Sequence, residues 1–265
     1  MSVPVALTIA GSDSSAGAGI QADLKTFASL GVYGASVVTA LTAQNTKGVL
    51  AVHDVPADFI AAQMDAVFSD LDISAVKIGM LANAAAIETV AAGLDRHRAR
   101  NVVVDPVMVA STGADLLRAD AIDALRKLIG RVGVVTPNLF EAAALLDVRM
   151  AREEGEMRAQ AQKLRAFGAA AVLIKGGHAG GLESIDLLVN TDGSELFSAP
   201  RIATKNTHGT GCTLSAAIAA GLAKGLSISA AVREGKGYVT AAIAAADRLN
   251  VGSGHGPLHH FHKWW

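Results

Sequence analysis

Apolar positions alternate between two patterns along the first two thirds of the chain. Short continuous runs rich in Val and Ile, bounded by glycine or polar residues, are typical of strands covered on both faces. Between them lie longer stretches in which apolar residues recur at helical spacing. The alternation predicts an α/β protein with a central, mostly parallel sheet and helices on both faces, a three-layer αβα arrangement. The predicted strands are Val5–Ala10, Ala35–Leu41, Ala75–Ile78, Val102–Val104, Val132–Val135 and Ala170–Ile174. The predicted helices are Ile20–Leu30, Ala57–Leu71, Ala84–His97, Ala119–Leu128, Leu139–Leu146 and Glu153–Phe167.

The pattern changes near residue 184. Ile185–Val189 and Leu196–Ala199 flank an Asn-Thr-Asp-Gly stretch, which predicts an antiparallel hairpin with a glycine turn. Two Ala-rich helices, Thr213–Ala223 and Ser229–Arg248, are expected to follow and to pack closely. No linker, low-complexity segment or internal repeat interrupts the pattern, so we expect one domain over residues 1–265.

Composition narrows the range of partners. About half of the 265 residues are apolar, the net charge is −1, and there is one cysteine. A single cysteine forms no internal disulfide, and no basic segment followed by an apolar one opens the sequence, so a cytoplasmic protein is expected. Neither nucleic acid nor an anionic membrane is an expected partner, because basic residues are not in excess. The longest uncharged apolar stretch, roughly Gly209–Ala223, is too short to span a bilayer. Small molecules are the expected ligands.

The cysteine stands in the most informative segment, Asn206–Thr213, behind two glycines and in front of an apolar helical run. Glycines let the backbone approach a ligand, and a helix that begins at or beside Cys212 would offer free N–H groups to phosphate. The same field would lower the pKa of the thiol. The alternative is a glycine turn that leads into a core helix with a small buried thiol.

The first predicted strand ends in a glycine loop. Gly17–Ala22 formally matches a dinucleotide-binding fingerprint, but the glycines lie too far beyond the strand, and no acidic residue follows at the required distance. A loop that covers a small substrate explains these glycines better. Asp23, one helical turn further on, is either a ligand of that substrate or a solvated carboxylate.

Two further strand ends offer groups for a flat heterocycle. Gln44 presents both a donor and an acceptor, which suits a ring edge that presents both, although such an amide is also common in turns. Met80 follows Gly79 and brings a flexible thioether that can lie against a ring or simply fill the core.

The remaining strand ends carry charge. Asp105 closes one strand, and Asn138 and Glu141 follow the next strand at a spacing that puts both side chains on one side of a helix start. Carboxylate and amide oxygens supplemented by water suit Mg²⁺, but Asn138 and Glu141 equally form a capping box. Lys175, before two glycines, can reach a nucleotide phosphate or lie in solvent.

These groups are weak signals singly, yet all fall at the carboxyl edge of one predicted sheet, where ligands bind in such folds. Positive groups, metal ligands and a backbone cradle are what phosphoryl transfer requires. The Gly-x-x-x-x-Gly-Lys-Ser/Thr motif is missing from the sequence, which excludes a Walker-type kinase.

At this point the motifs together resemble a known family. The chain is similar from Ile9 to His262 to the hydroxymethylpyrimidine/phosphomethylpyrimidine kinases of thiamine biosynthesis. The motifs that carry the resemblance are Ile9–Asp23, Thr39–Asn45, Lys77–Met80, Asp105–Met108, Thr136–Glu141, Lys175–His178 and Gly209–Thr213.

The resemblance implies a ribokinase-like fold, ATP and Mg²⁺ as cofactors, and a homodimer. It implies phosphorylation of 4-amino-5-hydroxymethyl-2-methylpyrimidine and then of its monophosphate to the diphosphate. Residues expected to line the pyrimidine pocket are Gly11, Asp23, Gln44, Met80 and Val107. Residues expected to hold ATP phosphates are Lys175, Thr207, Gly209, Thr210 and Gly211. Asp105, Asn138 and Glu141 would organise Mg²⁺. Catalysis would fall to Cys212, Gly209, Gly211 and Lys175, with Cys212 either a base or part of an anion hole.

Three alternatives stay open. Pyridoxal or sugar kinases share the ribokinase-like fold, and some of these pyridoxal kinases carry a second cysteine in the lid after the Asp-Pro motif, where this chain has Val107–Gly113 without one. A non-catalytic pyrimidine-binding paralogue is the third alternative.

The histidines of the tail, His255, His259, His260 and His262, suggest either a metal site or an ordinary surface tail, and the family resemblance favours the surface tail.

Overall fold

The computed structural model describes residues 3–109, 116–177 and 181–265. Within these residues one sheet has the strand order β3-β2-β1-β4-β5-β6-β7-β8-β9. The strands are β1 Val5–Asp13, β2 Tyr33–Asn45, β3 Gly48–Asp54, β4 Ala75–Ile78, β5 Val102–Val104, β6 Val134–Val135, β7 Ala171–Lys175, β8 Glu183–Asn190 and β9 Gly193–Pro200. The run from β2 to β7 is parallel, whereas β3, β8 and β9 pair antiparallel, so the predicted mostly parallel sheet is confirmed.

The predicted hairpin is also present. Strands β8 and β9 pair from Glu183↔Pro200 to Asn190↔Gly193 and leave Thr191 and Asp192 as the two-residue turn. Gly193 has a φ of 133°, a backbone conformation that favours glycine. Strand β3 was not predicted from the sequence, and it forms the opposite edge of the sheet.

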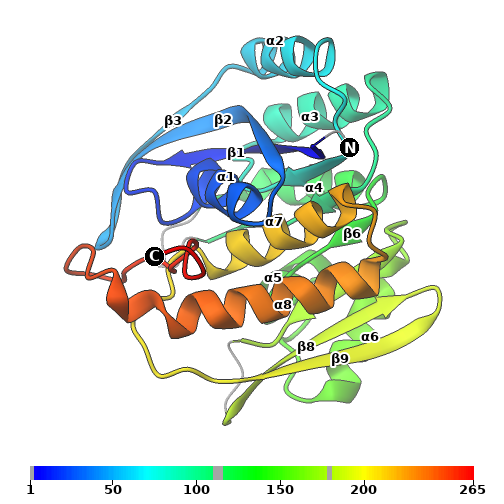
Figure 1. The fold of residues 1–265 in the computed structure, drawn as a ribbon. Helices are drawn as coiled ribbons and strands as arrows, with labels where there is room; N and C mark the ends of the chain where they lie inside the picture. The colour runs from blue at the N-terminus through cyan, green and yellow to red at the C-terminus, as the bar shows by residue number, and fades with distance from the viewer. Residues whose placement is uncertain (1–2, 110–115, 178–180) are drawn as a thin grey trace.

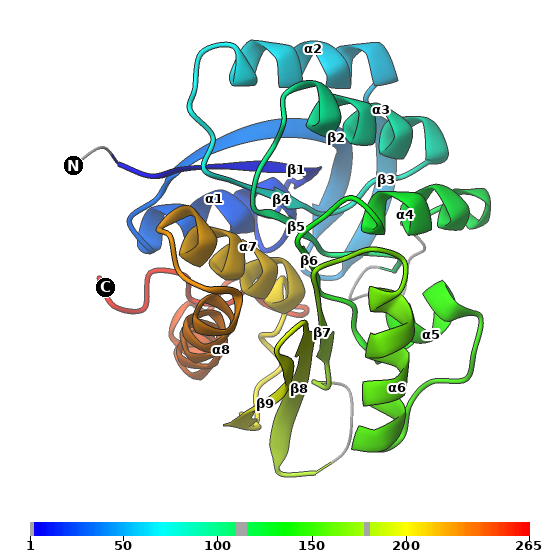
Figure 2. The same ribbon diagram turned by 90° about the vertical axis from the view of Figure 1, so that its right-hand side faces the viewer.

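Helices cover both faces of the sheet, as Figure 2 shows in side view. The helices are α1 Gly19–Ser29, α2 Ala57–Phe68, α3 Ala84–Arg96, α4 Ile122–Ile129, α5 Leu139–Leu146, α6 Glu154–Arg165, α7 Thr210–Ala223 and α8 Ile228–Ala244. Short 3-10 turns, η1 Ala119–Ala121 and η2 Ala246–Arg248, occupy the start and the end of two predicted helices.

Each face has its own apolar core. Side chains from α2 to α6 form one core with β-strand residues such as Ile9 and Ile78. Side chains from α1, α7 and α8 form the other, which includes Phe27 and Ile218. Figure 1 shows α7 and α8 side by side on this second face. The two cores confirm the predicted three layers, because the central strands are buried from both sides.

Strand order fixes where a ligand can bind. β1 lies between β2 and β4, so the chain leaves β1 toward one side of the sheet and later returns on the other side. In open α/β sheets this change of direction leaves a crevice beyond the carboxyl ends of the strands.

No helix in the described part of the chain is long and apolar enough to cross a membrane.

Candidate active site

The Gly209 turn, defined here as Thr207–Cys212, is a backbone cradle at the start of α7. Gly209 has a φ of 85° and precedes the first helical residue, Thr210. The Thr213 N–H bonds back to the Gly209 carbonyl at 2.9 Å, and the Thr210 N–H bonds to Thr207 at 3.2 Å. The N–H groups of Gly211 and Cys212 therefore lie in the first helical turn, where backbone N–H groups have no acceptor within the helix. The predicted helix start beside Cys212 is confirmed.

Close packing holds this turn against the loop that follows β1. A Cβ atom added at Gly209 would overlap the carbonyl oxygen of Gly17. A Cβ atom added at Gly17 would in turn overlap the ring of His208. The two glycine segments that the sequence separates by nearly 200 positions thus form one wall, and glycine is needed at both places.

The thiol of Cys212 lies in this wall and is partly buried. Burial raises its pKa above the ordinary value, while the nearby Lys77 ammonium and the Gly19 N–H act in the opposite direction. The predicted lowering of the thiol pKa by the helix is wrong for this structure. Desolvation, with the nearby carboxylates of Asp23 and Asp105, outweighs the opposing effects of Lys77 and the Gly19 N–H.

A lysine and two carboxylates face the Gly209 turn. Lys175 Nζ donates to Asp105 Oδ1 at 2.6 Å and lies 3.8 Å from Glu141 Oε2. A Cβ atom at Gly211 would be 3.4 Å from Asp105 Oδ2 and 3.5 Å from Lys175 Nζ. The ends of β5 and β7, the start of α5 and the Gly209 turn therefore meet at one point, as the strand-end argument predicts.

Burial and charge set the protonation of this cluster. Burial raises the pKa of Glu141 to about 7, with Lys175 lowering it and Asp105 raising it. Burial also lowers the pKa of Lys175, but the carboxylates of Asp105 and Glu141 outweigh that and raise it. The lysine stays charged, and a proton can be exchanged at Glu141 near neutral pH.

Asn138 and Glu141 form the capping box that the sequence left as an alternative. Asn138 Oδ1 accepts from the Glu141 N–H at 2.8 Å, and Glu141 Oε2 accepts from the Asn138 N–H at 2.7 Å. The cap does not exclude a second role, because Glu141 also lies beside Lys175. Among the residues that the structure describes, no three His, Cys, Asp or Glu side chains are grouped so as to hold a metal ion by themselves.

Beneath the cysteine lies an ion pair that the sequence analysis did not predict. Lys77 Nζ donates to Asp23 Oδ2 at 2.8 Å, and both side chains are completely buried. Thr8 donates to the same oxygen at 2.6 Å, whereas Asp23 Oδ1 is buried and has no hydrogen-bond partner among the described residues. Asp23 is thus not a solvated carboxylate, and its contact with a substrate stays a prediction.

Lys77 is held in its charged form. Burial lowers its pKa, but the Asp23 carboxylate, with Cys212 and Asp105 nearby, outweighs that effect and raises it. The signal in the sequence was a lysine inside an apolar strand, Ala75–Ile78, since a buried lysine requires a partner.

The residues predicted for a flat ring lie around the end of β1. A Cβ atom at Gly11 would be 3.0 Å from Met80 Sδ, so glycine at this position leaves room for the thioether. Val107 is half-buried two residues after Asp105. Gln44 Nε2 lies 3.3 Å from His208 Nε2, and its Oε1 accepts from Thr42 at 3.1 Å.

Asp13 and His208 were also missed. His208 Nε2 lies 2.8 Å from Asp13 Oδ2, and both side chains are buried. Asp13 Oδ2 also accepts from the Gly17 and Ala18 N–H groups at 3.1 and 2.8 Å. This pair joins the end of β1 to the Gly209 turn and to Gln44, so it brings the two predicted halves of the site together.

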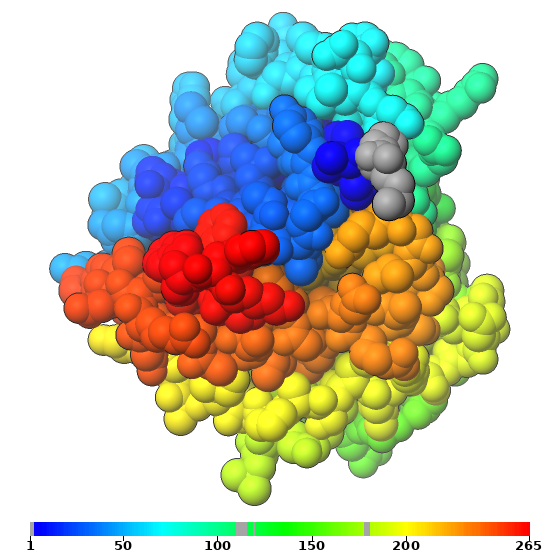
Figure 3. Space-filling view, viewed as in Figure 1, coloured from blue at the N-terminus to red at the C-terminus, as the bar shows by residue number. Residues whose placement is uncertain are grey.

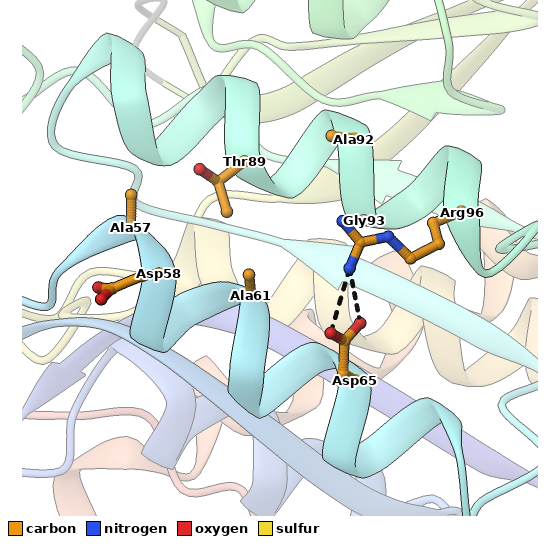
Figure 4. A pocket seen from close by; sticks show the side chains of 8 residues that line it. All are labelled: Ala57, Asp58, Ala61, Asp65, Thr89, Ala92, Gly93 and Arg96. Carbon is orange, nitrogen blue, oxygen red and sulfur yellow. Dashed lines mark hydrogen bonds and ion pairs between the residues drawn. The ribbon is translucent and has the colours of Figure 1, made fainter.

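Some predictions fall at the margin of this site or outside the described residues. Thr207 is exposed, and its carbonyl accepts from the Thr210 hydroxyl at 2.7 Å. The predicted lid sequence is described only as far as Val109, and His178 lies outside the described residues. Figure 4 shows a hollow between α2 and α3 whose lining includes Asp65 and Arg96 and none of the predicted site residues.

At the carboxyl edge of this mostly parallel sheet, a glycine-bounded helix start faces a lysine and two carboxylates. Solved kinases share the fold, and the chain is a kinase of the ribokinase-like class. A model of the family described as phosphomethylpyrimidine kinase matches residues 13–259. The chain belongs to this phosphomethylpyrimidine kinase family.

Relatives and solved structures agree with this family. A hydroxymethylpyrimidine/phosphomethylpyrimidine kinase of Rhizobium meliloti (strain 1021) is 59% identical over 262 residues, which cover 98% of each chain. The structure of a phosphomethylpyrimidine kinase from Clostridium difficile 630 is 42% identical, with a TM-score of 0.81, over 91% of this chain and 100% of that one. A pyridoxal kinase from Staphylococcus aureus, solved in complex with AMP-PCP, is 33% identical, with a TM-score of 0.91, over 100% and 96%.

Proposed function

We propose that this enzyme transfers the γ-phosphoryl group of ATP to 4-amino-5-hydroxymethyl-2-methylpyrimidine, and then phosphorylates the monophosphate to the diphosphate, in thiamine biosynthesis. The observation that carries the proposal is the meeting of the Gly209 turn with Lys175 and Asp105 beside the Gly11–Met80 contact. One part suits phosphates and the other a flat ring. The Rhizobium meliloti relative, named for this activity, matches the chain end to end.

The phosphate side supplies positive charge and backbone donors. The Lys175 ammonium and the N–H groups of Gly211 and Cys212 would donate to phosphoryl oxygens, whose charge is spread over the oxygens in the transition state. Thr207 and Thr210 frame the same turn and would contact the nucleotide. Preorganisation is the main contribution of the protein, because the turn is already packed against Gly17 before any ligand arrives.

Mg²⁺ fits the carboxylates of this site. The buried charges of Lys77 and Lys175 are already opposed by Asp23, Asp105 and Glu141, so little positive charge remains for a triphosphate. Asp105 and Glu141, with Asn138 beside them, would hold the ion at few points with water between, which Mg²⁺ accepts. When bound, Mg²⁺ supplies charge neutralisation on the phosphates.

The ring side supplies shape and a polar edge. Gly11, Met80 and Val107 would contact the faces of the pyrimidine, and Gln44 would read a ring nitrogen and the exocyclic amine. The Asp13–His208 pair lies against the Gln44 amide, and Thr42 donates to Gln44 Oε1. Asp23 would act on the substrate either by contact or through Lys77.

Substrate turnover tests the proposal directly. The protein is incubated with Mg-ATP and either the pyrimidine alcohol or its monophosphate, and ADP release is followed. Gln44→Ala should raise KM for the pyrimidine about tenfold or more without changing KM for ATP, because one hydrogen-bonded ring contact is lost. The exposed Gln162→Ala is the matched control. No turnover of either compound would refute the proposal.

Pyridoxal is the second candidate substrate. The Staphylococcus aureus neighbour, a pyridoxal kinase, matches the whole fold. The sequence after Asp105 lacks the second cysteine of some pyridoxal kinases, which favours the pyrimidine as the main substrate. Measuring kcat/KM for both alcohols and for the monophosphate shows which substrate the enzyme prefers. A higher kcat/KM for pyridoxal than for the pyrimidine would make pyridoxal the main substrate.

We further propose that the enzyme is a cytoplasmic homodimer built from one-domain subunits. The edge formed by β2 and β3 exposes Leu41, Leu50 and Val52, apolar side chains that a second copy could cover. Light scattering of the purified protein measures the mass, and a monomer at micromolar concentration would contradict the dimer.

A further inference from the structure

The C-terminal segment, defined here as Gly254–His262, is packed into the molecule. Pro257, Leu258, His259 and His260 are buried, so the interpretation as a surface tail is wrong for His259 and His260, whereas His255 is exposed as that interpretation expects. Figure 3 shows the C-terminal residues in red, lying against the blue N-terminal part and the orange helical part of the molecule. A polar segment is buried in this way only where its polar atoms find partners.

Several of these partners belong to the site just described. The Gly256 carbonyl accepts from the His208 N–H at 3.1 Å, and the Gly256 N–H donates to Asn206 Oδ1 at 3.1 Å. The His255 N–H donates to the carbonyl of Thr46, in the connection between β2 and β3, at 2.8 Å. The C-terminal segment therefore holds the backbone on the N-terminal side of Gly209.

His260 reaches the C-terminal side of the same glycine. Its Nε2 lies 3.0 Å from Thr213 Oγ1, and the Thr213 hydroxyl donates to the Gly209 carbonyl at 2.8 Å. With that hydroxyl hydrogen given to Gly209, the neutral ring tautomer that carries its hydrogen on Nε2 completes the chain by donating to Thr213. The chain of hydrogen bonds runs from His260 through Thr213 to Gly209.

His260 is itself fixed from behind. The Tyr238 hydroxyl donates to the His260 carbonyl at 2.8 Å and lies 2.6 Å from Ser29 Oγ on α1. Burial lowers the pKa of His260 to about 3, so the ring stays neutral at physiological pH, as a donor to Thr213 that carries no charge of its own. The His260 backbone is thus held by Tyr238 of α8, which Ser29 of α1 contacts in turn, and the ring contacts Thr213 of α7.

We propose that the C-terminal segment is a positioning element of the ATP site, in which His260 fixes the Gly209 turn through Thr213. The inference rests on the proposed function, since the turn is there assigned to ATP phosphates. His260 touches no substrate and acts only by holding the Gly209 carbonyl, and with it the direction of the N–H groups that follow. Losing this contact should impair phosphate binding and transfer, and leave the pyrimidine pocket unchanged.

The test compares His260→Phe with His260→Gln. Phenylalanine fills the cavity without a donor, whereas glutamine keeps an N–H for Thr213. We expect His260→Phe to lower kcat/KM for ATP about tenfold or more, to leave KM for the pyrimidine alcohol within about twofold, and His260→Gln to recover most of the loss. His255→Phe changes only an exposed ring of the same segment and keeps the backbone N–H that bonds to Thr46, so it should leave both parameters unchanged.

Four outcomes overturn the proposal: His260→Phe with normal kcat/KM for ATP, equal damage by Phe and Gln, a matching rise of KM for the alcohol, or equal loss in His255→Phe. Thermal unfolding checks that each variant is folded at the assay temperature. If His260→Phe does not fold, Thr213→Val breaks the same chain of hydrogen bonds from the other end and should show the same selectivity for ATP.

Calorimetric titration with ADP separates this inference from the proposed function. If the wild-type enzyme phosphorylates no pyrimidine, the assigned substrate is wrong, yet ADP affinity still reports on the Gly209 turn. A dissociation constant for ADP that is the same in wild type and in a folded His260→Phe or Thr213→Val variant would overturn the positioning role regardless of the alcohol used.

Discussion

Gly209 is the most tightly packed glycine of the site, so its substitution tests whether the site depends on the packing of the Gly209 turn. Gly209 and Gly225 both have a φ of 85°, so alanine suffers the same backbone strain at each position. A Cβ atom at Gly225 would meet nothing within 4 Å, whereas at Gly209 it would overlap the Gly17 carbonyl oxygen. Comparing the two substitutions therefore isolates the contact between the Gly209 turn and the β1–α1 loop.

The magnitudes follow from two separate effects. Left-handed backbone costs an alanine about 1–2 kcal/mol, which is the whole expected effect of Gly225→Ala on the free energy of unfolding. The overlap with the Gly17 carbonyl adds about 1–3 kcal/mol at Gly209, because neither the Gly209 turn nor the Gly17 backbone can move without disturbing the contacts around it. Relief of the overlap shifts the turn by roughly 1 Å, and a shift of that size costs about hundredfold in turnover.

Urea unfolding at pH 7 and the ADP-release assay measure both quantities. We expect Gly225→Ala to keep normal kcat/KM for ATP and Gly209→Ala to lose about hundredfold with a larger loss of stability. If the two variants lose equal stability and Gly209→Ala keeps its activity, the turn does not depend on its contact with Gly17, and the argument for a preorganised cradle fails.

Three further predictions concern the buried charges. Burial raises the pKa of Asp13, but hydrogen bonds led by the one with His208 outweigh burial and lower the pKa to about 2. The contribution of Asp13 to the free energy of unfolding is therefore complete above pH 4 and is lost as the pH falls through 2. In urea unfolding at pH 7, Asp13→Asn should cost about 2 kcal/mol, and Asp70→Asn, at an exposed position, nearly nothing. Lys77→Met should cost about 3–5 kcal/mol by the same assay, because Asp23 is left as an unpaired buried charge, and a Lys77→Met, Asp23→Leu double variant should regain much of the loss. Because the pKa of Glu141 is raised to about 7, its contribution to the free energy of unfolding is greatest below pH 4.5 and is lost as the pH rises through 7. Glu141→Gln should therefore become more stable relative to wild type as the pH rises from 5 to 8. A difference in unfolding free energy that stays constant over this range would contradict the raised pKa.

The order of strands and helices was predictable because each central element is buried on a regular pattern. Val102–Val104 is apolar at every position since helices cover both sides of β5. Strand β3 was missed for the opposite reason. Most of its side chains are exposed at the edge of the sheet, and its place is set by pairing with β2 and not by local periodicity.

The site was predictable where residues follow strands, and not where they depend on distant partners. Lys175 and Asp105 meet because parallel strands end at one edge. Nothing local to His260 indicates Thr213 as its partner, and nothing local to Asp13 indicates His208, since about 195 residues separate the second pair. A polar residue in the sequence predicts exposure, and only the folded chain shows that its hydrogen bonds are made inside.

The raised pKa of Cys212 turns its two possible roles into different pH profiles. A thiolate base must be deprotonated, and with a pKa above the ordinary value the thiolate is a small fraction of the enzyme at pH 7. Wild-type kcat should then rise about tenfold per pH unit through pH 8, and Cys212→Ala should lose both this slope and most of kcat while ligand binding is retained. If the residue only completes the anion hole, its backbone N–H does the work and kcat is flat from pH 7 to pH 9 in both proteins. We expect the rising profile, because the charged Lys77 near the sulfur stabilises a thiolate relative to a neutral thiol. A flat wild-type profile, or unchanged turnover in Cys212→Ala, would reject the base.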